Sequence, residues 1–244
     1  MDLAPVGHQL DGEDEPASAE LLELGAALYA TQCVTCHGAD GSGVEGRGPS
    51  LLIEGAAAAD FVLRTGRMPL PDPDLEARRL PVAYSEAEIV ALVAYVGALG
   101  DGPAIPDVDP LRGDAAEGGV LYRLHCAACH VASGSGAPIG GGRHAPPLME
   151  STPTQIGEAI LIGPGAMPVF GELTAREIDD IAAYVGELQR MDTTGATELG
   201  GIGPVAEGLA AWLLAIVPLV ALCRWIGEPR RVPEPSQPDT GVNT

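Results

Sequence analysis

The chain has 244 residues, and its 34 acidic and 13 basic side chains give it a formal net charge of -21 at neutral pH. All the basic residues are arginine. A chain this acidic is a poor candidate for binding nucleic acid or an anionic membrane surface, because both require a positive patch. The negative charge either keeps the surface soluble or serves in docking, and the length allows one large domain or two smaller ones.

Residues 1–19 are acidic and predict a disordered N-terminal tail. Apolar residues then recur at helical spacing from Glu20 to Ala30, which predicts a helix. This helix leads into Cys33-Val34-Thr35-Cys36-His37, the attachment signature of a c-type haem. Two thiols must reach the two vinyl groups of one porphyrin, while the adjacent histidine points at the iron as its proximal ligand. The alternatives are a redox dithiol and a zinc site, which would place two cysteine pairs around one ion.

The rest of this first unit runs from the haem motif to a second helix. Glycine and proline are frequent in the intervening stretch, so irregular backbone is predicted to wrap the porphyrin. Met68 is its only methionine and the candidate sixth iron ligand, because a thioether is a standard partner of histidine in electron-transfer haems. The alternative is a methionine that fills the core.

Ser85 and Glu88 then have capping-box spacing and open a helix with an apolar face.

A second unit repeats the first after a linker at residues 102–112. The matching blocks, in the same order, are Gly25–Cys33 with Gly118–Cys126, Arg47–Leu51 with His144–Leu148, Gly66–Pro69 with Gly165–Pro168, and Ser85–Gly97 with Thr174–Gly186. Cys126-Ala127-Ala128-Cys129-His130 is the second haem motif. The chain is therefore a tandem duplication, and each copy is predicted to hold one covalent haem c. Since no alternating strand pattern of useful length is present, the predicted fold class is all-α.

The sixth ligand of the second haem has three candidates, which are Met149, Met167 and His144. The repeat favours Met167, because the pattern Gly-x-Met-Pro occurs in both units and Met149 has no counterpart in the first. His37 and His130 are then the proximal ligands, and Met68 and Met167 the distal ones.

Residues 205–227 are almost wholly apolar and follow a linker at residues 192–204. A helix of this length reaches about 33 Å, which is enough to span a bilayer. Two tryptophans lie toward its ends, and Arg224 with the arginines of the tail at residues 228–244 places the C-terminus in the cytoplasm. We therefore expect a single-pass helix in the cell membrane, with the haem domains outside and a disordered cytoplasmic tail. The alternative, a buried helix of a soluble protein, would have nothing to pack against after two complete domains.

Export of the haem domains is not explained by the N-terminal sequence, which has neither the basic nor the apolar segment of an export signal. In this orientation the C-terminal helix cannot export what precedes it. We therefore expect that a signal or helix is missing from the start of this chain, through processing or a misplaced start.

The two units resemble the class I cytochrome c fold, and the predicted domains are residues 20–101 and 113–191. The resemblance implies that the helix before each haem motif crosses the last helix of its unit. It also implies that the carbonyl groups of Pro49 and Pro146 hydrogen-bond to the proximal imidazoles. Such bonds fix the orientation of the ring and tune the iron.

The order of the parts, together with four short phrases, resembles a known family. The phrases are Gly102–Asp109, Gly163–Phe170, Gly200–Gly208 and Leu222–Gly227. They are similar to the dihaem cytochrome cc subunit of the actinobacterial cytochrome bcc complex, over nearly all of residues 20–228. The sequence departs from that family in lacking an N-terminal apolar segment and in the stretch Pro138–Gly142, where longer side chains are usual.

The resemblance implies an electron relay. In that complex menaquinol is oxidised, and a Rieske iron–sulfur protein passes electrons to the first haem, at His37 and Met68. The second haem, at His130 and Met167, passes them to the copper centre of a terminal oxidase. The implied partners are the cytochrome b subunit, the Rieske subunit, the oxidase and the lipid bilayer, with no nucleic acid. The chain would be the electron-transfer subunit of a quinol–cytochrome c reductase and would perform no bond chemistry itself.

Other functions remain open from the sequence. A dihaem subunit of a haem–copper oxidase also relays electrons from a membrane anchor, although its anchor usually precedes the haem domains. A membrane-tethered shuttle outside any stable complex would have the same parts. A dihaem peroxidase or a thiosulfate-oxidising cytochrome would need an open or unusual sixth ligand, which the matched methionines disfavour.

Overall fold

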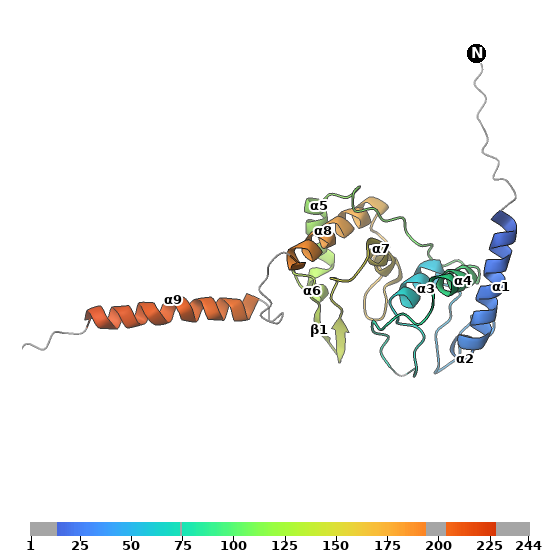
Figure 1. The fold of residues 1–244 in the computed structure, drawn as a ribbon, viewed down its shortest axis with the longest axis horizontal. Coiled ribbons are helices and arrows are strands. Elements are labelled where there is room, and N and C mark those ends of the chain that lie inside the picture. The colour runs from blue at the N-terminus through green and yellow to red at the C-terminus, as the bar shows by residue number, and fades with distance from the viewer. Residues whose placement is uncertain (1–13, 74, 194–203, 228–244) are drawn as a thin grey trace, which may run out of the picture. The chain divides into compact units, whose positions relative to one another are not determined.

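A computed structural model defines residues 14–73, 75–193 and 204–227 of the chain (Figure 1). The chain divides into two compact units, Met1–Thr194 and Gly195–Thr244. The described part of the first unit forms two domains of similar build. The described part of the second unit is one long helix.

The first domain contains the helices α1 (Asp14–Gln32), α2 (Val34–His37), α3 (Gly55–Arg64) and α4 (Glu86–Gly97). α2 carries the haem motif, and α4 begins at the predicted capping box. The Ser85 hydroxyl accepts from the Glu88 backbone N–H, and the Glu88 carboxylate accepts from the Ser85 N–H at 2.8 Å. The capping box is therefore confirmed.

Two expectations for this domain are corrected. Helix α1 begins at Asp14, so the predicted disordered tail is wrong over residues 14–19. Acidic residues and a proline favour a helix start, because they match the helix dipole and the unpaired first N–H groups. Residues 1–13 lie outside the described residues. The loop around the porphyrin site is not wholly irregular, because the alanine-rich stretch from Gly55 forms α3.

The second domain contains α5 (Ala115–His125), α6 (Ala127–His130), β1 (Ala137–Gly140), β2 (Arg143–Ala145), α7 (Pro153–Ile162) and α8 (Ala175–Thr193). β1 and β2 pair antiparallel, which corrects the expectation of no strands. They are too short for alternation to reveal them, and three glycines with positive φ of 89°, 60° and 76° form the connecting bend. Helices form the rest of the regular structure described, and the predicted all-α class is confirmed.

Each domain is held together by the crossing of two long helices. α1 crosses α4 at Gly25, where an added Cβ would lie 2.2 Å from the carbonyl oxygen of Ala91. α5 crosses α8 at Gly118, where an added Cβ would lie 1.9 Å from the carbonyl oxygen of Asp180. Glycine is required at both crossings, because any side chain would overlap the backbone of the facing helix.

Buried tyrosines and aliphatic side chains complete the two cores. The buried Tyr29 packs at a tilt against the half-buried Tyr95 at a centroid distance of 5.1 Å, and Tyr122 packs in the same way against Tyr184 at 5.3 Å. The faces of α4 and α8 that were predicted to be apolar are buried against them. Each domain therefore has its own small core, to one side of its haem motif.

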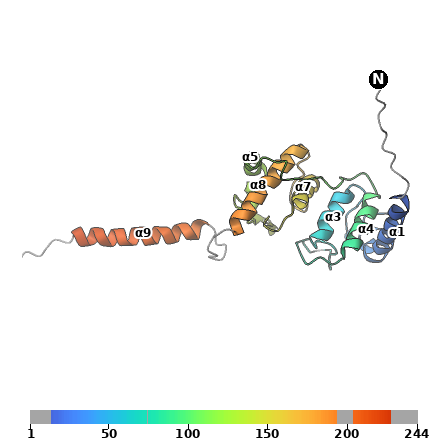
Figure 2. The same ribbon diagram turned by 45° about the horizontal axis from the view of Figure 1, so that its top comes forward.

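The two domains meet through α3 and α7, which lie side by side (Figures 1 and 2). Arg79 donates from Nη2 to Oε1 of Gln155 across this junction at 3.0 Å. Glu158 of α7 is fully buried here, and Asp60 of α3 accepts from Arg64 at 2.7 Å. Burial raises the pKa of Glu158 to about 9, with Asp60 raising it further and Arg64 lowering it.

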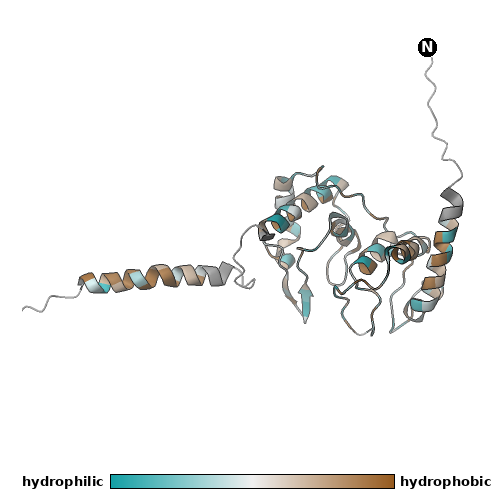
Figure 3. Ribbon diagram, in the orientation of Figure 1, coloured by the Kyte–Doolittle hydropathy of each residue, from teal (hydrophilic) through white to brown (hydrophobic). Residues whose placement is uncertain are grey.

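Helix α9 (Pro204–Gly227) makes up the described part of the second unit. Its residues Gly208–Gly227 have a mean hydropathy of 2.1, and none of the window is buried. Figure 3 shows apolar residues along much of its length. Among the described helices it is the one long and apolar enough to cross a membrane. Most of the predicted linker 192–204, and the whole predicted tail 228–244, lie outside the described residues.

Candidate haem sites

Both histidines of the haem motifs are held by a backbone carbonyl group. Nδ1 of His37 lies 2.9 Å from the carbonyl oxygen of Pro49, and Nδ1 of His130 lies 2.9 Å from that of Pro146. A carbonyl oxygen can only accept, so Nδ1 carries the proton and Nε2 keeps a free lone pair. This is the tautomer that a metal-ligating imidazole needs.

The segment after each histidine is fixed by a tyrosine of the preceding helix. The Tyr29 hydroxyl donates to the carbonyl oxygen of Gly38 at 2.8 Å, and the Tyr122 hydroxyl donates to that of Val131 at 2.8 Å. Burial raises the pKa of Tyr29 to about 12 and also raises that of Tyr122, so both hydroxyls keep the proton that they donate. The imidazole is therefore constrained by hydrogen bonds on both sides of its loop.

The four motif cysteines are partly buried free thiols beside these histidines. Burial raises the pKa of Cys33 and raises that of Cys126 to about 11, with the second cysteine of each motif adding to the effect. Protonated thiols are poor zinc ligands, because zinc binds the thiolate. Within the described residues no three histidine, cysteine or acidic side chains are grouped to hold a bare metal ion.

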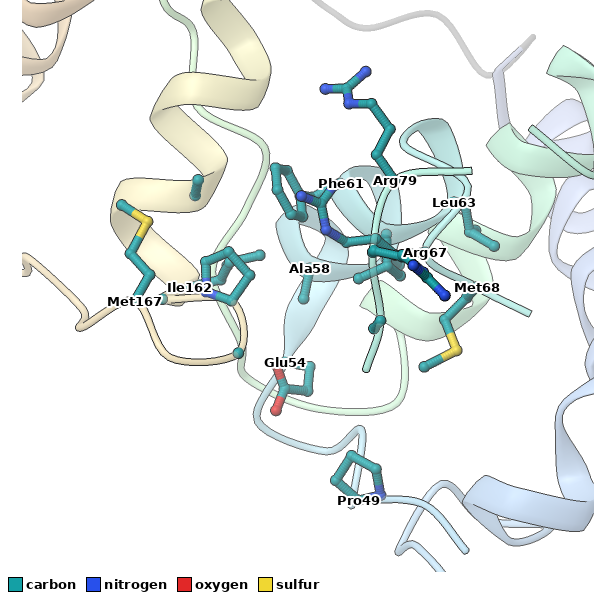
Figure 4. Close-up of a pocket in the computed structure, with 18 of the residues that line it drawn as sticks. Pro49, Glu54, Ala58, Phe61, Leu63, Arg67, Met68, Arg79, Ile162 and Met167 are labelled. Atoms are coloured by element: carbon teal, nitrogen blue, oxygen red, sulfur yellow. The ribbon is translucent and has the colours of Figure 1, made fainter. Parts of the chain in front are cut away.

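One cavity of about 1350 Å³ runs past both haem motifs (Figure 4). The four motif cysteines, both motif histidines, Met68 and Met167 all line it. Its volume exceeds the ~300–1,000 Å³ of an ordinary ligand site, as expected for a space that takes two large groups. The walls between the polar groups are mostly aliphatic and aromatic, so the donors and the cavity both fit two porphyrins bound through thioethers.

The candidates for the sixth ligand occupy different places. Met68 packs against the core of the first domain and Met167 against that of the second, and Figure 4 shows them on opposite sides of the cavity. Met149 is not among the described residues that line the cavity, and its Cε lies near Gly134. His144 lines the cavity from β2 but is exposed. Of the two methionines in question, Met167 is thus the one placed at the site.

Comparisons with known proteins agree with this geometry. The family model described as "Cytochrome C oxidase, cbb3-type, subunit III" matches residues 20–96 and 113–185. The cytochrome bc1 complex cytochrome c subunit of Corynebacterium diphtheriae is 41% identical over 234 residues, covering 88% of this chain and 82% of that protein. The subunit of the same name from Mycobacterium tuberculosis H37Rv is 42% identical over 224 residues, covering 88% and 80%. The chain belongs to this family of cytochrome c subunits.

Membership of the family makes the chain an electron-transfer cytochrome with covalently bound haem c. Among solved structures, the chain is similar to reduced recombinant cytochrome c4 from Pseudomonas stutzeri, with a TM-score of 0.26 and 20% identity. That match covers 67% of this chain and 96% of that one, and at this TM-score it carries no argument.

The sequence gives no hint of several residues that line the cavity. Arg67 and Phe61 meet in its wall, with the guanidinium carbon 4.7 Å from the ring centroid. His125, directly before Cys126, is half-buried and packs edge-on against Phe170 at a centroid distance of 5.6 Å. These contacts join residues that are distant in sequence, such as His125 and Phe170, and no local pattern reveals them.

Proposed function

We propose that the chain is a membrane-anchored dihaem cytochrome c of a cytochrome bc1-type complex. It takes electrons from the Rieske iron–sulfur protein at the first haem and delivers them from the second haem to the copper centre of a terminal oxidase. The observation that carries the proposal is the single cavity lined by two complete sets of cysteine, histidine and methionine groups. The names of the relatives that cover most of the chain support the complex.

In this proposal each histidine holds the iron through Nε2, and each proline carbonyl holds that histidine. The bond between Nδ1 of His37 and Pro49, like that between His130 and Pro146, keeps the ring in one orientation in both redox states. Burial lowers the pKa of His130, which favours the neutral ring that a ligand must have. Covalently bound haem supplies a reversible one-electron iron couple at each site.

Met68 and Met167 are the proposed distal ligands, which makes both sites closed to small molecules. The thioether is a soft ligand that favours electron transfer over oxygen chemistry. Tyr29 and Tyr122 hold the histidine loops through their hydroxyl groups, and apolar side chains form most of the cavity wall. The chain therefore needs no general acid or base and performs no bond chemistry.

The proposed anchor is α9, with the haem domains outside the cell membrane and the C-terminus in the cytoplasm. Its length and hydropathy support a span, and Arg224 near its C-terminal end supports the orientation by the positive-inside rule. Replacing Leu209–Leu222 by a polar linker should release a soluble dihaem protein. If that protein still sediments with membranes, the anchor is elsewhere.

A second candidate is a dihaem subunit of a haem–copper oxidase, favoured by the name of the matching family model. The decisive experiment is a mild detergent extraction through a C-terminal tag, followed by haem staining and identification of the partners. Recovery with a b-type cytochrome, a Rieske protein and an oxidase supports the proposal. Recovery with oxidase subunits alone favours the second candidate, and recovery of a lone haem protein indicates a tethered shuttle.

The distal ligands are tested by a matched pair of substitutions in the second domain. Met167→Ala should leave the haem attached and turn its iron high-spin or open to added ligands, as read from the absorption spectrum. Met149→Ala removes a methionine from the same domain and should leave the low-spin spectrum unchanged. If instead Met149→Ala opens the iron and Met167→Ala does not, Met149 is the ligand; if neither does, His144 is tested next.

A further inference from the structure

A buried arginine that has no counter-ion among the described residues forms part of the cavity wall. Arg67 is only 8% exposed, and its Nη1 is buried with no hydrogen-bond partner in the described part of the chain. The guanidinium group is always charged in proteins. An unpaired charge costs several kcal/mol to bury, on the order found for broken buried ion pairs. The described part of the folded chain therefore offers no group that balances the charge of Arg67.

The neighbours of Arg67 do not supply that group. Its guanidinium lies over the ring of Phe61, but this contact replaces neither the counter-charge nor the hydrogen bonds that burial removes. Among the described residues no carboxylate forms an ion pair with it, although the chain as a whole is strongly acidic.

The position of Arg67 is nevertheless fixed by the backbone. Its N–H donates to the carbonyl oxygen of Val62 at 2.8 Å, and the N–H of Met68 donates to the same oxygen at 3.1 Å. Gly66, before it, has a φ of 64° and lies against the Leu80 carbonyl group, where a Cβ would be 2.1 Å away. Arg67 is thus held next to the proposed distal ligand of the first domain (Figure 4).

We propose that Arg67 binds a propionate carboxylate of the haem in the first domain. The inference rests on the proposed haem site at His37 and Met68. The propionates are the only anionic side groups of a haem, and a guanidinium pairs with a carboxylate through two parallel hydrogen bonds. The second domain has Ala166 at the matching place, so this charge pair belongs to the first haem alone.

The pair has a consequence for electron transfer. A propionate without a counter-ion favours the oxidised, more positive state of the iron. Arg67 neutralises it and therefore raises the midpoint potential of the first haem. Within the relay, Arg67 is a positioning residue that sets the potential of one haem relative to the other.

The test is a spectroelectrochemical titration of the full-length dihaem protein in detergent, compared with its Arg67→Gln variant. The midpoint potential of the first haem should fall by about 60 mV, which corresponds to a tenfold change in its one-electron equilibrium constant. That of the second haem, identified by its response to Met167→Ala, should not move. Arg67→Lys keeps the charge and should restore most of the shift. Arg78→Gln removes an exposed cavity-lining charge and should change neither potential, because solvent screens it.

The outcomes separate this inference from the proposed function. Full haem staining with an unshifted first potential, or an equal fall in Arg67→Lys and Arg67→Gln, overturns the role of Arg67 and leaves the haem sites standing. Wild-type protein without covalent haem on Cys33 and Cys36 would overturn both. If Arg67→Gln does not incorporate haem, Arg67→Leu is titrated instead, since it fills the apolar wall without a buried polar group; an unchanged potential there again overturns the proposal.

Discussion

The two haem domains hold their motif histidines by the same hydrogen bonds but differ in the residues that make up the loop. Tyr29 donates to the carbonyl group of Gly38, and Tyr122 donates at the same distance to that of Val131. Gly38 has φ 79° and ψ 161°, and Val131 has φ 54° and ψ 169°. The backbone geometry is thus common to both sites. Glycine adopts it without strain at position 38, whereas valine at position 131 does not. The residue after each motif histidine therefore has to place its carbonyl group where the tyrosine hydroxyl can donate to it, and its side chain matters less.

A second difference concerns the electrostatic surroundings. The first domain brings Arg67 to the cavity and pairs Asp60 with Arg64 at the junction. The second domain brings the fully buried Glu158 to the same junction and has no arginine at the place of Arg67. Two domains with the same arrangement of helices therefore bury different ionisable side chains: an arginine at the cavity in the first, and a glutamate whose raised pKa keeps it protonated at neutral pH in the second.

The largest effect is expected where the two domains are most alike, at the helix crossings. Gly118→Ala would place a Cβ 1.9 Å from the Asp180 carbonyl oxygen, so α5 and α8 must separate. We expect a loss of about 3 kcal/mol or more in the free energy of unfolding, at or above the upper end of overpacking costs. Gly25→Ala, whose Cβ would lie 2.2 Å from its facing oxygen, should cost somewhat less. Guanidinium titration followed by circular dichroism gives the loss, and hydrogen exchange assigns it to one domain.

The control for these variants is Gly186→Ala in α8. Apart from its chain neighbours and the nearby backbone of its own helix, no described atom lies within 4 Å of a Cβ at Gly186. Alanine there should be neutral or stabilise by about 0.5–1 kcal/mol, because glycine is unfavourable inside a helix. Equal stability of Gly118→Ala and Gly186→Ala would show that the crossings do not require glycine.

The next largest effect is expected at Glu158, which the second domain buries at the junction. The pKa of Glu158 is about 9 in the folded chain, above its ordinary value, so the folded state holds a proton that the unfolded state releases. Its contribution to stability is present below about pH 4.5 and is lost as the pH rises toward 9. Glu158→Gln cannot ionise and should gain about 2 kcal/mol over the wild type by pH 8, in the range for a buried group without a partner. Thermal unfolding at pH 5, 6.5 and 8 measures the gain.

The matched control for that prediction is Glu150→Gln, at an exposed position of the same domain. It should follow the wild type at every pH. A Glu158→Gln variant that also follows the wild type would mean that the carboxyl group is hydrated at the junction, and the two domains would then not differ in this buried charge.

Much of this molecule could be predicted from the sequence, because the haem motifs, the repeat and the capping boxes are local patterns. Spacing alone was enough to predict that the motif cysteines and histidines lie together, and comparison with the first unit was enough to predict Met167 beside them; all of them line the cavity. Arg67 and Glu158 could not be found in this way, since their burial depends on segments brought together by the fold. The hairpin at Ala137–Ala145 was missed because glycine conformations, not side-chain alternation, form it.

The smallest effect concerns the residue after each motif histidine. Val131 has φ 54° with ψ 169°, a region open almost only to glycine and costing about 1–3 kcal/mol for other residues. Val131→Gly relieves this strain and keeps the carbonyl group that accepts from Tyr122. Part of the gain is offset because glycine has more freedom in the unfolded chain. We expect a net stabilisation of about 1 kcal/mol, measured by guanidinium titration of the holo-protein.

The reciprocal change makes the comparison complete. Gly38→Val imposes on the first domain the strain that the second already carries, and its Cβ would also lie 3.3 Å from the Asp40 carboxylate and from the Gly43 carbonyl oxygen, which is a tight contact. It should destabilise by about 1–2 kcal/mol through backbone strain, and the tight contact adds to this loss. Opposite signs for Val131→Gly and Gly38→Val, with the haem spectra unchanged, would establish that both sites share one strained backbone. A Val131→Gly variant less stable than the wild type would mean that the valine side chain contributes more by packing than its backbone costs, and the two loops would then be held by different forces.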